Sequence, residues 1–177
     1  MFESIERVPG DAILGLIEAF KNDKNPNKVD LGVGVYRDEQ GNTPIMRAVK
    51  QAEKLLIDNE QTKAYIGSHG DPEYGADILK TVFGAESEVL ANDRASATQS
   101  PGGTGALRLA ADFIKSNLPG KSIWLSDPTW PNHLGVFSAA GLDIQRYPYV
   151  DEHNQLDFDG MAAALKAIPK GDIVVLH

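Results

Sequence analysis

Residues 99–108 read QSPGGTGALR, a stretch in which three glycines and a threonine separate a strand-like run from a helix-like run. A glycine-rich turn that opens a helix leaves backbone N–H groups unpaired, and the helix dipole points its positive end at the same place. The Thr104 hydroxyl adds another donor. The stretch therefore predicts either a phosphate-binding turn or a tight turn without a ligand, and its spacing matches neither the dinucleotide fingerprint nor the P-loop.

On both sides of this stretch, short extended runs alternate with helical ones. Extended runs are predicted at 95–100, 122–126, 142–150 and 172–177, with a helix between each pair. This order favours right-handed crossovers, so the expected fold class is α/β with a mainly parallel sheet and flanking helices. The final run, DIVVLH, has no crossover after it, and the chain is therefore expected to be an incomplete part of a larger domain.

Three helices are predicted before the sheet. Each is expected to begin at a capping residue or pair, namely Asp11, Thr43-Pro44 and Asp71. Gly84 is placed to end the third of them. The segment LGVGVYRDEQGNTP between the first two is hairpin-like, and the domain boundary is predicted near residue 45. Residues 1–45 would form an N-terminal arm and the start of a small domain, and residues 46–177 the first part of a large one.

Composition excludes several classes of function. The net charge is -8 with a pI near 4.9, and Lys and Arg form no cluster, which argues against a nucleic-acid partner. No run reaches the roughly 18 apolar residues of a membrane helix, and the start MFESIERVPGD does not read as a signal peptide. The absence of cysteine excludes disulfides and thiolate metal sites, and no metal site is expected. We expect a soluble, cytoplasmic protein with a small-molecule partner.

A second cluster, SDPTWPNH at 126–133, follows the strand-like run SIWLS and belongs to the same sheet edge as the glycine stretch. Trp130, one of two tryptophans, lies there in a proline-flanked loop. Its indole would suit stacking on a flat heteroaromatic ring, and the alternative is a side chain that plugs the sheet edge. Taken alone, His133 is interpreted first as a structural histidine.

Several segments together resemble class I pyridoxal-phosphate-dependent aminotransferases, the aspartate and aromatic amino acid enzymes, in order and in spacing. The likeness runs over the whole chain and corresponds to the N-terminal portion of that family. The segments that carry it are LGVGVYRDEQGNTP, TKAYIGSHGDPEYG, QSPGGTGALRLAADF, SDPTWPNH and the terminal VVLH. The resemblance implies fold type I of the pyridoxal-phosphate transferases, with an incomplete large domain and the N-terminal part of the small domain.

The resemblance also implies roles in binding pyridoxal 5'-phosphate. Gly102, Gly103 and Thr104 would form part of the phosphate cup, and Gly102 stands at a position where the family often has serine or glycine. Trp130 would stack on the pyridine ring and border the substrate carboxylate. Tyr65 would reach across a homodimer to the phosphate and substrate of the neighbouring subunit.

Three further positions match the family. Gly34 would contact the carboxylate end of the substrate from a loop of the small domain. His133 and His177 would lie near the cofactor and support the aspartate that pairs with the pyridine nitrogen. The apolar arm at Met1-Phe2 would lie on the other subunit of the dimer.

The implied activity is transamination between an L-amino acid, aspartate preferred and aromatic possible, and 2-oxoglutarate. None of the 11 lysines lies in the context of the family's Schiff-base lysine, so no catalytic residue is assigned and the fragment alone is expected to be inactive. The alternatives are a non-catalytic module that binds a phosphate ligand through the glycine stretch, and a structural partner of another subunit.

Overall fold

The computed structural model describes residue 3, residues 12–32 and residues 34–177. It divides into two compact units, Met1–Lys63 and Ala64–His177, and each is described by itself. The boundary predicted near residue 45 separates the small domain from the large domain of the family fold. It is a different division from these two units and stays a prediction. Asp11, Met1 and Phe2, to which the sequence assigned a helix cap and an arm, lie outside the described residues.

The first unit contains α1 (Ala12–Asn22) and α2 (Arg47–Asn59). Lys28 Nζ donates to the carbonyl of Phe20, 2.6 Å away, and so satisfies a backbone acceptor in the last turn of α1. The hairpin-like segment forms a turn in which a carboxylate oxygen of Asp38 accepts from the Asn42 N–H at 2.8 Å. No strand flanks this turn within the described residues.

The predicted start of the second helix at Pro44 is wrong, because α2 begins at Arg47 with Met46 in the N-cap position. Thr43 does not cap it. Its hydroxyl donates to the carbonyl of Tyr36 at 3.0 Å, so the side chain expected to open the helix is bonded to the turn before it.

The second unit begins with α3 (Pro72–Phe83), and both predicted ends are confirmed. Asp71 caps it by accepting the Tyr74 N–H at 2.9 Å, and Gly84 ends it at φ +87°, where a side chain would be strained. A short helix that the sequence did not predict, α4 (Glu88–Ala91), follows with Ser87 at its N-cap.

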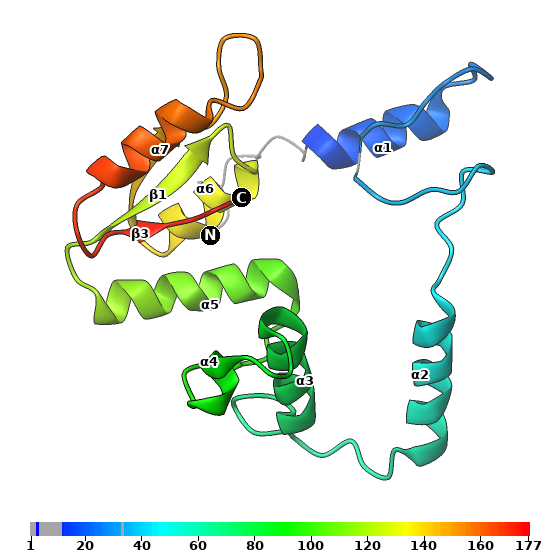
Figure 1. The fold of residues 1–177 in the computed structure, drawn as a ribbon. Helices are drawn as coiled ribbons and strands as arrows, with labels where there is room; N and C mark the ends of the chain where they lie inside the picture. Colours follow the sequence, from blue (N-terminus) through cyan, green and yellow to red (C-terminus); the bar gives the residue numbers. More distant parts are fainter. Residues whose placement is uncertain (1–2, 4–11, 33) are drawn as a thin grey trace. The chain divides into compact units, whose positions relative to one another are not determined.

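The rest of the second unit is a parallel sheet with helices. The strands β1 (Ser122–Asp127), β2 (Asp143–Pro148) and β3 (Ile173–Val174) lie in the order β2-β1-β3, and both pairings are parallel. The connecting helices are α5 (Gly102–Asn117), α6 (Pro131–Ala139) and α7 (Phe158–Ala167). Figure 1 shows α6 and α7 beside these strands. The predicted α/β class with a parallel sheet is confirmed.

One predicted strand is absent. Residues 95–100 are extended but pair with no strand among the described residues. The backbone N–H of Gln99 instead donates to the carbonyl of His69 at 2.9 Å, which ties this segment to the loop before α3. A strand is defined by a hydrogen-bonded neighbour as well as by its own extended backbone, and the described part of the chain supplies none here.

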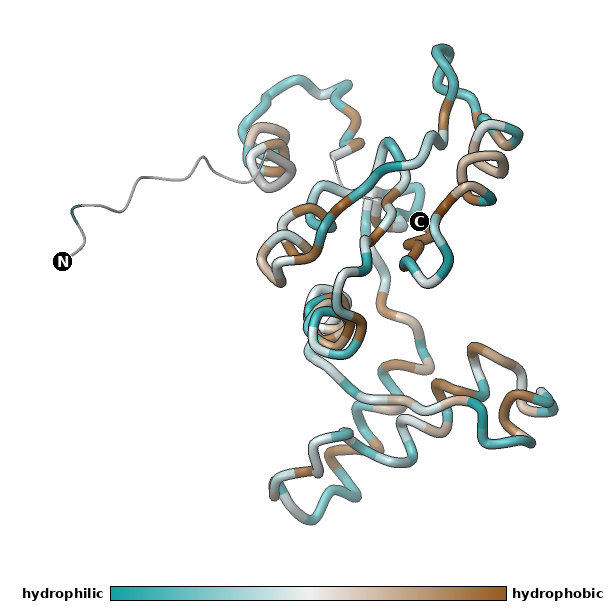
Figure 2. Tube along the Cα trace, turned by 90° about the vertical axis from the view of Figure 1, so that its left-hand side faces the viewer, coloured by the Kyte–Doolittle hydropathy of each residue, from teal (hydrophilic) through white to brown (hydrophobic). Residues whose placement is uncertain are grey.

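The hydrophobic core lies where α5 and α6 cover β1. Its buried members are Ala111, Ile123, Leu125, Val136, Phe137 and Leu142. Figure 2 shows apolar residues recurring along the helices of the chain, and the apolar residues of α2 and α3 are not buried.

No helix among the described residues is both long and apolar enough to cross a membrane.

Candidate functional site

The glycine stretch forms the first turn of α5, which begins at Gly102. Gly102 has a φ of +68°, a backbone conformation that favours glycine. A Cβ built on Gly102 or Gly103 would meet nothing within 4 Å, so the space beside the turn is open. The backbone N–H groups of a first helical turn have no partner inside the helix, and the N-cap residue Pro101 supplies no side-chain bond. The turn can therefore accept an anion from outside.

Two segments that are distant in sequence meet at this turn. The side-chain amide of Asn132, in the first turn of α6, donates to the Thr104 hydroxyl oxygen at 3.0 Å. Asn132 stands two residues after Trp130 in the same loop and helix start. The glycine stretch and the SDPTWPNH cluster thus meet at the starts of α5 and α6, and the second of them follows the carboxyl end of β1. They meet although residues 95–100, predicted as a strand of the same sheet, pair with no strand among the described residues.

Trp130 is the N-cap residue of α6, and its side chain is 37% exposed. Its ring and the His133 ring make a T-shaped contact, with centroids 5.4 Å apart and planes at 84°. One side of the indole is thus supported from within the protein, while part of the ring remains accessible. This geometry leaves the indole available for stacking against a ligand.

His133 is 4% exposed and lies inside a cluster of rings. It stacks on Phe137 at 5.9 Å between centroids and meets the edge of the His177 ring at 4.9 Å. Its Nδ1 is hydrogen-bonded to the Thr129 hydroxyl at 2.8 Å, which fixes the orientation of the imidazole. Burial lowers the pKa of His133 below its ordinary value, and the neighbouring His177 lowers that pKa further.

This lowered pKa makes the stability of the second unit depend on pH. Unfolded His133 binds a proton near pH 6.5, whereas folded His133 binds one only at lower pH. The unfolded state therefore takes up more protons, and we expect the free energy of unfolding to decrease as the pH falls below about 6.5. Urea unfolding at pH 7.5 and pH 5.5 measures this, and His133→Gln should reduce the difference between the two.

His153→Gln is the matched control for that experiment. His153 lies exposed in the loop between β2 and α7, and its replacement should leave the difference between pH 7.5 and pH 5.5 as it is in the unchanged protein. An equal effect of the two replacements would contradict the role of burial at His133.

Two other predicted site residues, Tyr65 and Gly34, take no part in the contacts just described. Tyr65 belongs to the second unit, and its side chain is fully exposed in a stretch without regular structure. Gly34 belongs to the first unit, is exposed, and has nothing within 4 Å of a built Cβ. Within the second unit, the residues brought together are those at the start of α5, at the start of α6 and at the end of the chain.

The sequence reading missed how the loop before α3 is held against the glycine stretch. The side-chain oxygen of Gln99 accepts the Asp71 N–H at 3.0 Å, and Gly70, at φ +87°, passes close beside Gln99. A Cβ at Gly70 would lie 2.2 Å from the Cβ of Gln99. The only sequence signal of this contact is a glycine placed directly before the Asp71 cap.

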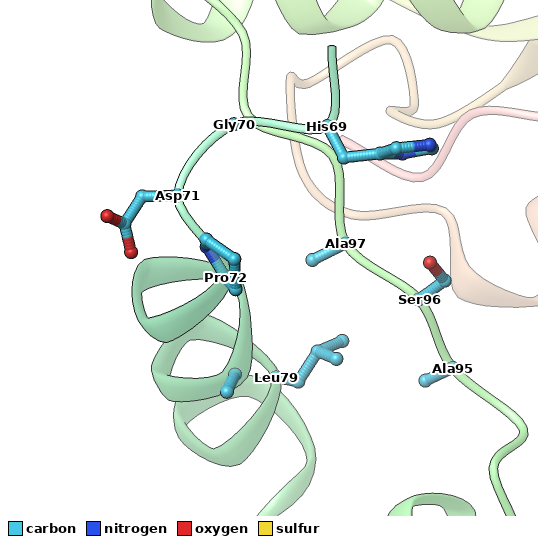
Figure 3. A pocket seen from close by; sticks show the side chains of 10 residues that line it. His69, Gly70, Asp71, Pro72, Leu79, Ala95, Ser96 and Ala97 are labelled. Carbon is cyan, nitrogen blue, oxygen red and sulfur yellow. The ribbon is translucent and has the colours of Figure 1, made fainter. Parts of the chain in front are cut away.

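A cavity of about 460 Å³ lies beside this contact. Figure 3 shows Leu79 projecting from α3 toward the extended segment at Ala95 to Ala97, with His69 and Asp71 at the rim. A second hollow, of about 360 Å³, is bordered by Gly102 and Gly103 on the side of α3. The first cavity contains none of the predicted site residues, so the cluster at Thr104 and Trp130 remains the candidate site.

Comparison with known proteins decides the family. Residues 26–177 match the family described as aminotransferase class I and II. The chain belongs to this family. The prediction made from the sequence motifs is confirmed, including their assignment to the class I aminotransferases.

Curated relatives cover the whole chain. The sequence is 56% identical to the aromatic-amino-acid aminotransferase of Pseudomonas aeruginosa, over 99% of this chain and 44% of that protein. It is 47% identical to the aspartate aminotransferase of Escherichia coli, over 100% of this chain and 45% of that protein. The chain thus spans less than half the length of these relatives of the family.

Solved structures of the family agree with the fold. The aromatic-amino-acid aminotransferase of Burkholderia pseudomallei, covalently bound to pyridoxal phosphate, superposes with a TM-score of 0.91 at 44% identity, over 100% of this chain and 45% of that one. The cytoplasmic aspartate aminotransferase of Saccharomyces cerevisiae gives a TM-score of 0.90 at 38% identity, over 100% of this chain and 43% of that one. The chain has the fold of the matching part of these aminotransferases.

Proposed function

We propose that this chain is the N-terminal part of an aminotransferase that uses pyridoxal 5'-phosphate to transfer an amino group between an L-amino acid and 2-oxoglutarate. The observation that supports the proposal is the bond between Thr104 and Asn132, which joins an open glycine turn at the start of α5 to the start of α6, where the indole of Trp130 is partly exposed. Unpaired helix N–H groups suit a phosphate, and an indole suits a flat ring. The residues present therefore fit a phosphorylated pyridine.

The proposed tasks of the residues follow from their chemistry. Gly102, Gly103 and Thr104 hold the phosphate through backbone N–H groups and a hydroxyl. Trp130 covers one face of the ring and, packed against buried His133, keeps its orientation. The bound cofactor supplies an electron sink, which is the chemistry that protein side chains lack. No lysine of this chain is assigned as its covalent attachment point, so turnover is expected only where the family's remaining catalytic residues are present.

The amino acid substrate has two candidates. The motifs LGVGVYRDE and YIGSHGDPEYG favour aspartate. The 56% identity to an aromatic-amino-acid aminotransferase favours an aromatic amino acid as the second candidate. We further propose a cytoplasmic homodimer in which the fully exposed Tyr65 contributes to the site of the partner.

Activity and cofactor binding test the proposal separately. The protein containing this chain should bind pyridoxal phosphate with a shifted visible absorbance and convert aspartate or an aromatic amino acid with 2-oxoglutarate. The 177 residues by themselves should show neither turnover nor a lysine-dependent absorbance band. Binding of other phosphate compounds as tightly as pyridoxal phosphate, with no turnover, would instead support the non-catalytic module.

A further inference from the structure

Asn132 takes part in the candidate site, yet none of the roles proposed above uses it. Its side-chain amide donates to the Thr104 hydroxyl oxygen at 3.0 Å, and it stands half-buried in the first turn of α6. The two residues are 28 positions apart in the sequence, so this bond joins two separate elements. It is a contact between side chains, and each can be replaced without altering the backbone.

The direction of this bond determines what the Thr104 hydroxyl can do. A hydroxyl carries one hydrogen to donate and two lone pairs that accept. Because the amide of Asn132 occupies one lone pair, the hydroxyl hydrogen cannot point toward Asn132, where it would meet another donor. The hydrogen is left to point elsewhere, and the space beside the preceding glycines is open.

We propose that Asn132 is a positioning residue that keeps the Thr104 hydroxyl a hydrogen-bond donor toward the phosphate of the bound cofactor. This inference rests on the proposed function, because the phosphate is the anion that the oriented hydroxyl would meet. A charged acceptor strengthens such a bond, so orienting the donor beforehand increases affinity for the phosphorylated ligand in particular.

The discriminating measurement compares two ligands, pyridoxal phosphate and pyridoxal, which differ only in the phosphate. Equilibrium dialysis of the whole protein that contains this chain gives the dissociation constant of each, and their ratio isolates the phosphate contact. General damage to the pocket weakens both ligands alike and leaves the ratio unchanged. A role of Asn132 that is only structural would therefore not alter the ratio.

Asn132→Asp is the most informative variant, because it keeps the shape and reverses the bond. The carboxylate accepts from the Thr104 hydroxyl, turns its hydrogen away from the phosphate and adds a like charge. We expect the preference for pyridoxal phosphate over pyridoxal to fall by roughly 10- to 100-fold. Asn132→Ala, which frees the hydroxyl without redirecting it, should lower the preference by about 3-fold.

A double-mutant cycle tests whether Asn132 acts through Thr104. Thr104→Val should lower the preference by about 10-fold, and adding Asn132→Ala to it should cause no further change. Thr104→Ser keeps the hydroxyl and should preserve most of the preference. The matched control is Asn117→Ala, since Asn117 donates only within α5, to the carbonyl of Phe113 at 2.9 Å, and its removal should leave the preference unchanged.

The possible outcomes distinguish a failure of the role proposed for Asn132 from a failure of the proposed function. A marked preference for pyridoxal phosphate that Asn132→Asp leaves intact would overturn the role of Asn132 while the proposed function stands. Additive losses in the double variant would overturn it too, because the two residues would then act independently. An unchanged protein that binds both ligands equally would overturn the proposed function and this inference with it.

Discussion

Gly70→Ala is expected to lower the free energy of unfolding of the second unit by about 3 kcal/mol. Gly70 has a φ of +87°, where an alanine is strained by roughly 1–2 kcal/mol. The new methyl group would also lie 2.2 Å from the Cβ of Gln99 and 2.6 Å from its side-chain oxygen, so the backbone must move. Urea unfolding followed by tryptophan fluorescence measures the loss, since Trp124 and Trp130 both lie in this unit.

Gly84→Ala is a closely matched control for that experiment. Gly84 has the same φ of +87°, but a Cβ there meets nothing within 4 Å. Its replacement should therefore cost only the conformational strain, roughly 1–2 kcal/mol. Equal decreases in the free energy of unfolding at the two positions would show that the close approach of Gly70 to Gln99 does not add to the cost of the substitution.

Trp130→Ala is expected to weaken the binding of pyridoxal phosphate by roughly 30-fold, or about 2 kcal/mol. Removal of the indole takes away the flat surface proposed to cover the pyridine ring, together with its contact on His133. Trp130→Phe keeps an aromatic face and should lose only about 3-fold. Equilibrium dialysis is the suitable method, because the variant lacks one of the two tryptophans on which fluorescence depends.

Trp124→Phe controls for the loss of a tryptophan as such. Trp124 lies in β1, and its indole nitrogen donates to Asp172 at 3.0 Å, away from the start of α6. Its replacement should leave cofactor affinity nearly unchanged. Unaltered affinity in Trp130→Ala as well would favour the other interpretation of Trp130, a side chain that plugs the sheet edge.

Features set by local chemistry could be predicted from the sequence. Asp71 and Gly84 mark the ends of α3 because a capping side chain and a glycine with a positive φ both act within one helical turn. The parallel sheet follows from the alternation of extended and helical runs, because each run can be recognised from its own residues. The glycine stretch and Trp130 could be chosen as candidate site residues for the same reason, and their roles stay predictions.

Features that depend on a distant partner could not be predicted. Thr43 has the composition of a cap, but its hydroxyl bonds to the carbonyl of Tyr36, and the helix starts later. Residues 95–100 have the composition of a strand, but they pair with no strand among the described residues. The bond between Asn132 and Thr104 joins positions 28 apart, and no pattern in either segment encodes it.

This long-range junction has a consequence for how the protein matures. A ligand that engages the starts of α5 and α6 together binds the folded chain and not the unfolded one, so it shifts the folding equilibrium by mass action. At a free concentration about 100 times the dissociation constant, that shift is roughly 2.7 kcal/mol. If the proposed cofactor binds here, vitamin supply would govern how much of the newly made polypeptide survives proteolysis, in addition to how much of it is active.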